Sequence, residues 1–285
     1  MSKRNLILLA LAVVSFTAAL VGVAIFRRPP SAPPRTGATR LRAPLAVRQA
    51  IFDLIQPVKL ANCTLERFGE PHDGGYVMCA NLLGSAKAAY SYGISGYDQW
   101  GCDISTRLKV EVHQYDCFNL TRPSCAGGKT VFHEECVGAA NKTEEGRLFD
   151  SIESQFAKNG HAGQHLVVKM DVEGAEWDSL MAAPDKVLDQ IDQLSIELHG
   201  VREERFVSVL KRLKQNFYIA HLHFNNYSCQ SNLAPMPAWA YEVLFVNKRI
   251  GVPDTSGKID ASDSLDAPNN PNVPDCQSVI GVASR

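Results

Sequence analysis

Carboxylates and imidazoles follow three apolar runs in the second half of the chain. Asp171 comes directly after HLVVKM, Glu197 and His199 lie in LSIELHG, and His223 lies in AHLHFNN. A carboxylate that orients a histidine allows the ring to remove a proton from a hydroxyl group. The same residue types can hold a divalent metal that acidifies the hydroxyl. Two interpretations therefore remain open: Asp171 and His199 as a catalytic base pair, or Asp171, Glu197 and His223 as metal ligands.

A second group of candidate residues follows the apolar run at residues 88–93, where the chain continues as ISGYDQWG. Glycines in such a turn let the backbone approach a ligand, and an acid after the next strand, here Asp116, can accept hydrogen bonds from ribose hydroxyls. The turn lacks GxGxxG, which disfavours NAD and FAD. Because Asp98 and Asp103 lie nearby, the pattern favours a nucleoside with a positive centre over a diphosphate.

These residues must be positioned by a sheet whose strands end at one edge. Seven apolar runs predict strands, at residues 88–93, 110–115, 130–136, 166–170, 193–198, 217–223 and 241–247. Amphipathic patterns predict helices at residues 144–159 and 203–217. Strands that alternate with helices predict an α/β fold with a mostly parallel sheet covered on both faces. In such sheets the ligand binds beyond the carboxyl ends of the strands.

The two ends of the chain differ in composition from this central part. Residues 6–26 carry no charge, are long enough to cross the ~30 Å hydrocarbon layer, and are flanked by basic pairs. We predict an uncleaved signal anchor, a transmembrane helix, there, although a cleaved signal peptide is the competing interpretation. The resulting division is a cytoplasmic tip (1–5), the anchor (6–26), a Pro/Arg-rich stem (27–48), a catalytic domain (49–250) and a flexible tail (251–285).

The charge and the cysteine content of the chain indicate which partners and which cellular compartment to expect. Eight of the 29 basic residues and none of the 30 acidic residues precede residue 49, so the rest of the chain is acidic and nucleic acid is a disfavoured partner. Eight cysteines without a CxxC pair predict disulfide bonds, whose pairing stays open. Sequons at Asn62, Asn119, Asn141 and Asn226 add to the prediction of a lumenal or extracytoplasmic glycoprotein, in the Golgi, the endoplasmic reticulum or an equivalent compartment.

Several of these runs together resemble one family. YSYGISGYDQWGCDIS, QYDCF, KMDVEGAEWDSL and LSIELHG, preceded by RFGEPHDGGYVMC, resemble FkbM-type and related methyltransferase-like domains over about residues 60–250. The resemblance implies a class I, Rossmann-like methyltransferase that uses S-adenosylmethionine, with a seven-stranded sheet whose last strand is antiparallel. It also implies cofactor contacts, with Asp116 at the ribose, Glu134 and Glu135 near the adenine, and further contacts from Tyr92, Gly93, Ser95 and Gly96.

The prediction that follows is a membrane-anchored methyltransferase that modifies a hydroxyl group of a glycan or small-molecule acceptor, with a divalent cation as an optional second cofactor. A Golgi-type glycosyltransferase has the same order of anchor, stem and lumenal body, but its DxD metal motif is present only as Asp171-Val172-Glu173. A non-catalytic binding module on a methyltransferase scaffold is the third possibility. The DGGY run at residues 73–76 predicts a turn.

Overall fold

The structure is a computed structural model that describes residues 44–256 and 265–276. The predicted anchor at residues 6–26, and the stem up to residue 43, lie outside the described residues. Within the part that is described, none of the helices has the length and apolar character needed to cross a membrane.

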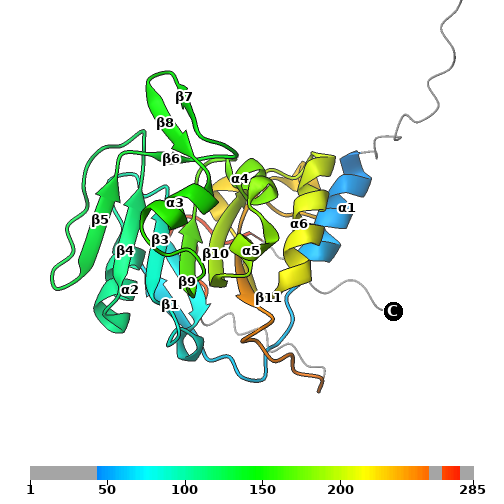
Figure 1. Ribbon diagram of the computed structural model, residues 1–285. Helices are drawn as coiled ribbons and strands as arrows, with labels where there is room; N and C mark the ends of the chain where they lie inside the picture. The colour runs from blue at the N-terminus through cyan, green and yellow to red at the C-terminus, as the bar shows by residue number, and fades with distance from the viewer. Residues whose placement is uncertain (1–43, 257–264, 277–285) are drawn as a thin grey trace, which may run out of the picture. The chain divides into compact units, whose positions relative to one another are not determined.

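A seven-stranded sheet forms the centre of the fold, in the order β11-β12-β10-β9-β3-β4-β5 (Figure 1). Strand β12 is antiparallel to β10 and β11, and the other pairs of neighbours are parallel. The predicted α/β architecture with a mostly parallel sheet is therefore confirmed. Its strands are β3 (Ala88–Tyr92), β4 (Glu111–Tyr115), β5 (Lys129–His133), β9 (Leu166–Met170), β10 (Ile191–His199), β11 (Phe217–Phe224) and β12 (Ala240–Asn247).

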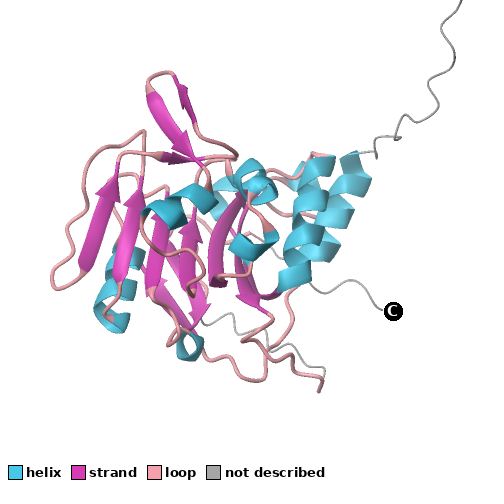
Figure 2. Ribbon diagram, viewed as in Figure 1, coloured by secondary structure: helices cyan, strands magenta, loops and turns pink. Residues whose placement is uncertain are grey.

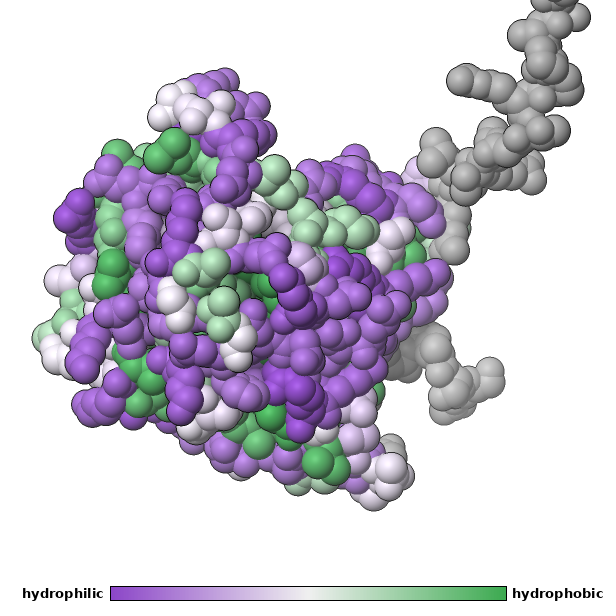
Figure 3. All heavy atoms as spheres, viewed as in Figure 1, coloured by the Kyte–Doolittle hydropathy of each residue, from purple (hydrophilic) through white to green (hydrophobic). Residues whose placement is uncertain are grey.

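Helices and a hairpin cover the two faces of this sheet (Figures 1 and 2). One face carries α1 (Pro44–Ile55), α3 (Ile152–Lys158), α4 (Glu176–Ala182), α5 (Asp185–Leu188) and α6 (Glu204–Asn216). The other carries α2 (Gln99–Leu108) and the hairpin of β1 (Leu65–Gly69) and β2 (Gly75–Cys79). Because side chains alternate along a strand, Tyr90 joins the first hydrophobic cluster and Ala89 the second. The face of the molecule seen in Figure 3 is mainly hydrophilic, with scattered hydrophobic residues.

The helix predicted over residues 144–159 is wrong in its first half. Residues 142–150 form a hairpin of β7 (Lys142–Glu144) and β8 (Arg147–Asp150), which pairs with β6 (Cys136–Val137) in a small sheet. Glu145 and Gly146 both have positive φ, as a tight two-residue turn requires. The helix begins after Ser151, whose side chain accepts a hydrogen bond from the backbone of Ser154. The described residues also form three short 3-10 helices, η1 (Ala80–Leu82), η2 (Asn226–Ser228) and η3 (Ser231–Leu233).

The folded part extends beyond residues 49–250 at both ends. Helix α1 begins at Pro44, inside the predicted stem, and places Val47, Ile51 and Ile55 against the core because four-residue spacing keeps them on one face. Residues 265–276, inside the predicted tail, are packed as well, since only 2% of the Asn269 surface is exposed. A fragment ending at residue 250 would therefore lose native contacts.

All eight cysteines form disulfides, as predicted. The pairs are Cys63–Cys79, Cys102–Cys125, Cys117–Cys136 and Cys229–Cys276. The sequons differ in accessibility. Asn141 is exposed, whereas Asn226 is 6% exposed and its side-chain nitrogen donates to the carbonyls of Asn270 and Val273. A glycan on Asn226 would remove these bonds.

Candidate functional site

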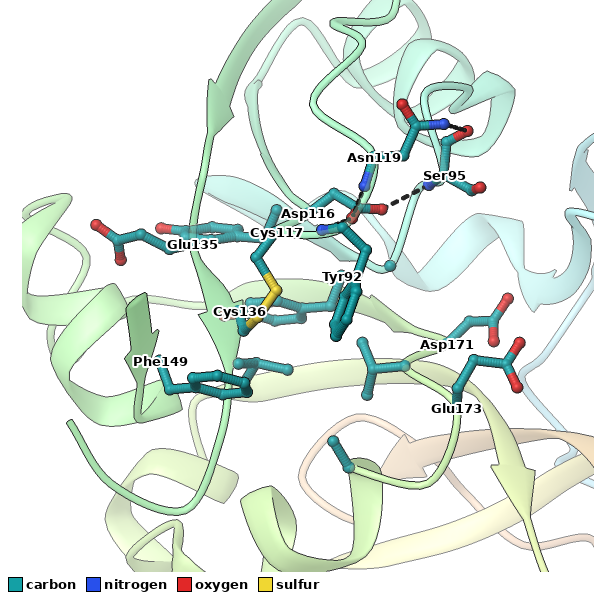
Figure 4. A pocket seen from close by; sticks show the side chains of 16 residues that line it. Tyr92, Ser95, Asp116, Cys117, Asn119, Glu135, Cys136, Phe149, Asp171 and Glu173 are labelled. Atoms are coloured by element: carbon teal, nitrogen blue, oxygen red, sulfur yellow. Dashed lines mark hydrogen bonds between the residues drawn. A yellow bond between two sulfur atoms is a disulfide. The ribbon is translucent and has the colours of Figure 1, made fainter. Parts of the chain in front are cut away.

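A cavity of about 270 Å³ lies beyond the carboxyl ends of β3, β4 and β9 (Figure 4). From β3 the chain continues to β4 and β5 on one side of the sheet, and then to β9 and β10 on the other. The order of the strands therefore reverses between β3 and β9. Open α/β sheets bind their ligands at such a switch point.

The structure places five of the seven predicted cofactor residues in the lining of this cavity: Tyr92, Gly93, Ser95, Asp116 and Glu135. Gly96 and Glu134 are not part of the lining. A side chain at Gly96 would meet the Asn119 amide at 2.9 Å, so this glycine permits close packing between two loops.

The loop after β3 depends on Gly93. This residue has a φ of +71°, and a Cβ atom there would lie 1.6 Å from the carbonyl oxygen of Asp171. Glycine alone allows both the left-handed conformation and the close approach of the two backbones. Gly93 thus brings the loops after β3 and β9 together at the cavity.

Asp116 holds the loops after β3 and β4 in place. Its Oδ2 accepts hydrogen bonds from the backbone of Ile94 (3.2 Å) and Ser95 (2.7 Å), and its Oδ1 from Phe118 (2.8 Å) and Asn119 (2.9 Å). An ionised carboxylate offers about four acceptor sites, and all of these are taken. The predicted ribose contact therefore has no free acceptor at Asp116, and the side chain acts instead as a brace for the cavity wall.

Tyr92 contributes a polar atom without a partner. Its side chain is fully buried, lines the cavity, and has a hydroxyl that makes no hydrogen bond. Burial, followed by the nearby Tyr115 and Tyr90, raises the pKa of this hydroxyl well above its ordinary value, so it remains a donor. Phe149 and the Cys117–Cys136 disulfide give the wall an apolar part (Figure 4). These features suit the flat, partly polar base of a nucleoside.

Of the predicted catalytic pair, Asp171 lines this cavity, and His199 lies next to Asp171 in the lining of a neighbouring cavity. Asp171 follows β9 and points in the same direction as Glu173 (Figure 4). His199 ends β10, and its Nε2 lies 4.0 Å from Oδ1 of Asp171 and 3.5 Å from Oε2 of Glu173. The Tyr76 hydroxyl donates to Oδ2 of Asp171 over a long 3.4 Å. With 26% of its side chain exposed, Asp171 keeps acceptor capacity for a ligand.

His199 is oriented by Glu176, a contact that the sequence analysis did not predict. The Nδ1 atom of His199 donates to Oε1 of Glu176 at 3.0 Å, and Glu176 is fully buried at the start of α4. Burial lowers the pKa of His199, but the Glu176 hydrogen bond and the charges of Glu176, Glu197 and Asp171 raise it to about 9. The ring is therefore protonated at neutral pH. A cation bound nearby would favour loss of that proton.

The structure does not bring Asp171, Glu197 and His223, the predicted metal ligands, together in one group. Glu242 of β12 lies opposite both Glu197 and His223, because the antiparallel β12 is inserted between β10 and β11. His223 is bonded on one side to Glu242 (3.3 Å) and on the other to Asp275 (2.9 Å). Among residues 44–256 and 265–276, two other groups could hold a cation: Asp171 with Glu173 and His199, and Asp73 with Glu197 and Glu242.

The site and the fold define an α/β protein with a ligand cavity at the switch point of its sheet. No protein-family model matches the chain, and no curated protein matches it in sequence. Among solved structures, the chain is similar to fibrillarin, a pre-rRNA processing protein of Methanococcus jannaschii, with 11% identity and a TM-score of 0.32. The match covers 58% of this chain and 68% of that one. Values this low carry no argument about fold or function.

Proposed function

We propose that this protein is an S-adenosylmethionine-dependent methyltransferase that acts on a hydroxyl oxygen of a glycan or small-molecule acceptor. One observation carries the proposal: Asp171 lines the switch-point cavity, and Nε2 of His199 lies 4.0 Å from its Oδ1. The antiparallel β12 within an otherwise parallel run of strands, and the DVEGAE run that resembles FkbM-type domains, are consistent with it.

The cavity fits the nucleoside part of such a cofactor. The Tyr92 hydroxyl would gain a partner, and Phe149 would contact the base, whereas Asp116 would act through the loops that it holds. When bound, the cofactor supplies an electrophilic methyl group on a positively charged sulfur. The negative carboxylates of Asp171 and Glu173, which line the cavity, would attract the positively charged sulfur.

The chain itself must position the acceptor oxygen and take up one proton. Glu176 fixes the His199 ring through Nδ1 and leaves Nε2 directed toward Asp171. Once Nε2 has lost its own proton, it can accept the proton of the acceptor hydroxyl, and Asp171 stabilises the imidazolium that forms. Orientation of the reactants and this proton transfer are the two contributions that we assign to the protein.

The proposal places the catalytic part in an oxidising compartment behind the anchor predicted at residues 6–26. Its support is the four disulfides, because such bonds persist in secreted and lumenal proteins and are rare in the cytosol. Membrane attachment would then confine the enzyme to acceptors that pass the membrane surface.

The test uses the full chain, because α1 and residues 265–276 belong to the folded part. Calorimetry should show binding of S-adenosylmethionine and S-adenosylhomocysteine, and labelled methyl groups should pass to a member of a glycan panel. Asp171→Asn should abolish transfer and retain cofactor binding, whereas Asp53→Asn, an exposed control on α1, should match the wild type. A wild-type chain that binds neither cofactor form would refute the proposal.

A glycosyltransferase remains the second candidate, because the two acids of the Asp171-Val172-Glu173 motif lie close to each other and to His199. One ligand atom each of Asp171, Glu173 and His199 lies within 4.8 Å of the others, so the group could bind a cation that neutralises a sugar diphosphate. Calorimetry with nucleotide sugars in the presence of Mn²⁺ distinguishes the two activities. Binding of a nucleotide sugar without binding of S-adenosylmethionine would favour this alternative.

A further inference from the structure

A second cavity, of about 420 Å³, lies beside His199 and has a size typical of small-molecule sites. His199 and Gly200, at the end of β10, and Trp239, just before β12, form part of its wall. The antiparallel register brings these segments together. His199 is paired with Ala240, and the backbone N–H of Gly200 donates to the carbonyl oxygen of Trp239 at 2.7 Å. The cavity therefore adjoins the residue to which we assign the acceptor's proton.

The two cavities differ in the sign of their charge. The charged residues described in the wall of the first cavity are all acids: Asp116, Glu135, Asp171 and Glu173. The described wall of the second cavity contains one acid, Glu203, and three basic residues: His199, Arg202 and Arg205. Acidic walls suit a positively charged cofactor, and basic walls suit a negatively charged ligand. The second cavity is thus basic although the chain after residue 48 is acidic as a whole.

The two arginines of this wall differ in their partners. Arg205 is bonded to Glu203 at 2.6 Å and also to Asp178, so its charge is compensated within the chain. Arg202 is exposed in the loop between β10 and α6, and its side chain has no ion pair or hydrogen bond within residues 44–256 and 265–276. A guanidinium group offers parallel N–H donors that match the two oxygens of a carboxylate. Arg202 is therefore available to an anionic ligand.

Trp239 adds an aromatic surface next to His199. It is 38% exposed although its side chain is large and apolar, and its ring centroid lies 6.0 Å from that of His199. A sugar ring presents C–H groups on its face, and these pack well on an aromatic ring, whose face carries partial negative charge. A sugar packed on Trp239 would bring its hydroxyl groups close to His199.

We propose that the second cavity binds the methyl acceptor, and that this acceptor is an acidic saccharide whose carboxylate pairs with Arg202 and whose ring packs on Trp239. The inference rests on the proposed function and narrows its acceptor to a sugar of the uronic acid type. The carboxylate serves in binding, and a hydroxyl group reacts. Its oxygen forms a bond to the methyl carbon as the sulfur–carbon bond breaks, its proton passes to Nε2 of His199, and S-adenosylhomocysteine leaves.

The binding experiment uses acrylamide quenching of tryptophan fluorescence in the full chain. Of the three tryptophans, Trp100 and Trp177 are 1% and 0% exposed, so quenching reports on Trp239. The probes are methyl β-D-glucuronide and methyl β-D-glucoside, which differ only in a carboxylate against a hydroxymethyl group. We expect the glucuronide to protect Trp239 and to bind at least tenfold more tightly than the glucoside.

Variants separate the contact with Arg202 from the general effect of charge. Arg202→Gln should abolish the preference for the glucuronide. The matched control Lys211→Gln removes one positive charge from an exposed position on α6 outside the cavity, and should retain the preference. Trp239→Leu should weaken glucuronide binding about tenfold, whereas Trp239→Phe should stay within threefold of the wild type. Saturation-transfer NMR measures binding to these two variants, and their Tm values verify that they fold.

The inference is overturned if the wild type binds both sugars equally or neither, if Arg202→Gln retains the preference, or if folded Trp239→Leu retains wild-type affinity. These measurements need no cofactor, so they are independent of methyl transfer. A chain that binds the glucuronide but not S-adenosylmethionine would refute the proposed function and leave the sugar site standing. A chain that methylates the glucoside as well as the glucuronide would refute the inference alone.

Discussion

The ends of β4 and β9 carry the same residue type in opposite situations. Asp116 follows β4 and is saturated by four backbone N–H groups. Asp171 follows β9, is partly exposed, accepts a long hydrogen bond from Tyr76, and has longer contacts with Lys169 (3.8 Å) and His199 (4.0 Å). The first carboxylate uses its charge to build the cavity, and the second keeps its charge available at the mouth.

This difference shows how the protein separates binding from chemistry. A carboxylate whose acceptors are all occupied within the chain stabilises a conformation and has little left for a ligand. A carboxylate with free acceptors beside a protonated histidine can change partners during a reaction. Substitutions at the two aspartates should therefore have different consequences.

The largest effect is expected for Asp171→Asn. Loss of its charge removes the group that stabilises the His199 imidazolium, so methyl transfer should fall by about 10³-fold. The free energy of unfolding should change by less than about 1 kcal/mol, because the side chain is partly exposed and weakly bonded. Single-turnover transfer and urea unfolding measure the two quantities. A methyl-transfer rate within threefold of the wild-type rate would contradict the catalytic role proposed for Asp171, and with it the difference from Asp116.

Asp116→Asn should act mainly on stability. The new NH₂ group would face two backbone N–H donors, and the free energy of unfolding should fall by about 3 kcal/mol. Urea unfolding at neutral pH measures the loss, with Asp53→Asn as the exposed control. A loss below about 0.5 kcal/mol would show that the four hydrogen bonds do not brace the loops.

The pH dependence of stability tests the environment of His199. Its pKa is about 9 in the folded chain and about 6.5 when unfolded, so its contribution is complete below pH 6.5 and is lost as pH rises to 9. The contribution is of order 3 kcal/mol. His199→Gln should remove this part of the decline in the free energy of unfolding between pH 6.5 and 9. His223, whose pKa is also about 9, should account for a separate part. Equal slopes for His199→Gln and the wild type would contradict the Glu176 contact.

The smallest effect on the fold is expected for Tyr92→Phe. Because the hydroxyl has no partner, its removal should leave the free energy of unfolding unchanged or raise it by up to about 1 kcal/mol. Affinity for S-adenosylmethionine should fall about tenfold if the ligand accepts a hydrogen bond from this group. Calorimetry on both proteins provides the comparison. Unchanged affinity would show that the bound nucleoside does not use this donor.

Local sequence patterns were sufficient to predict the strands of the sheet but not to predict where one helix begins. Apolar runs such as LVVKM predict β9 with its observed bounds, because a buried parallel strand needs apolar side chains on both faces. Around Leu148 and Phe149 the helical spacing was misleading. The positive φ angles of Glu145 and Gly146 reverse the chain there, so Phe149 belongs to β8 and lines the cavity.

The sequence by itself determined the alternation of strands and helices, the use of disulfides, and the location of acids and imidazoles at strand ends. These properties depend on the periodicity and chemistry of neighbouring residues. Only the tertiary structure decided what each acid does. Asp116 is saturated because two loops turn their N–H groups toward it, and His223 is separated from Asp171 because β12 enters the sheet between β10 and β11. Such outcomes depend on contacts between distant segments, which no local pattern encodes.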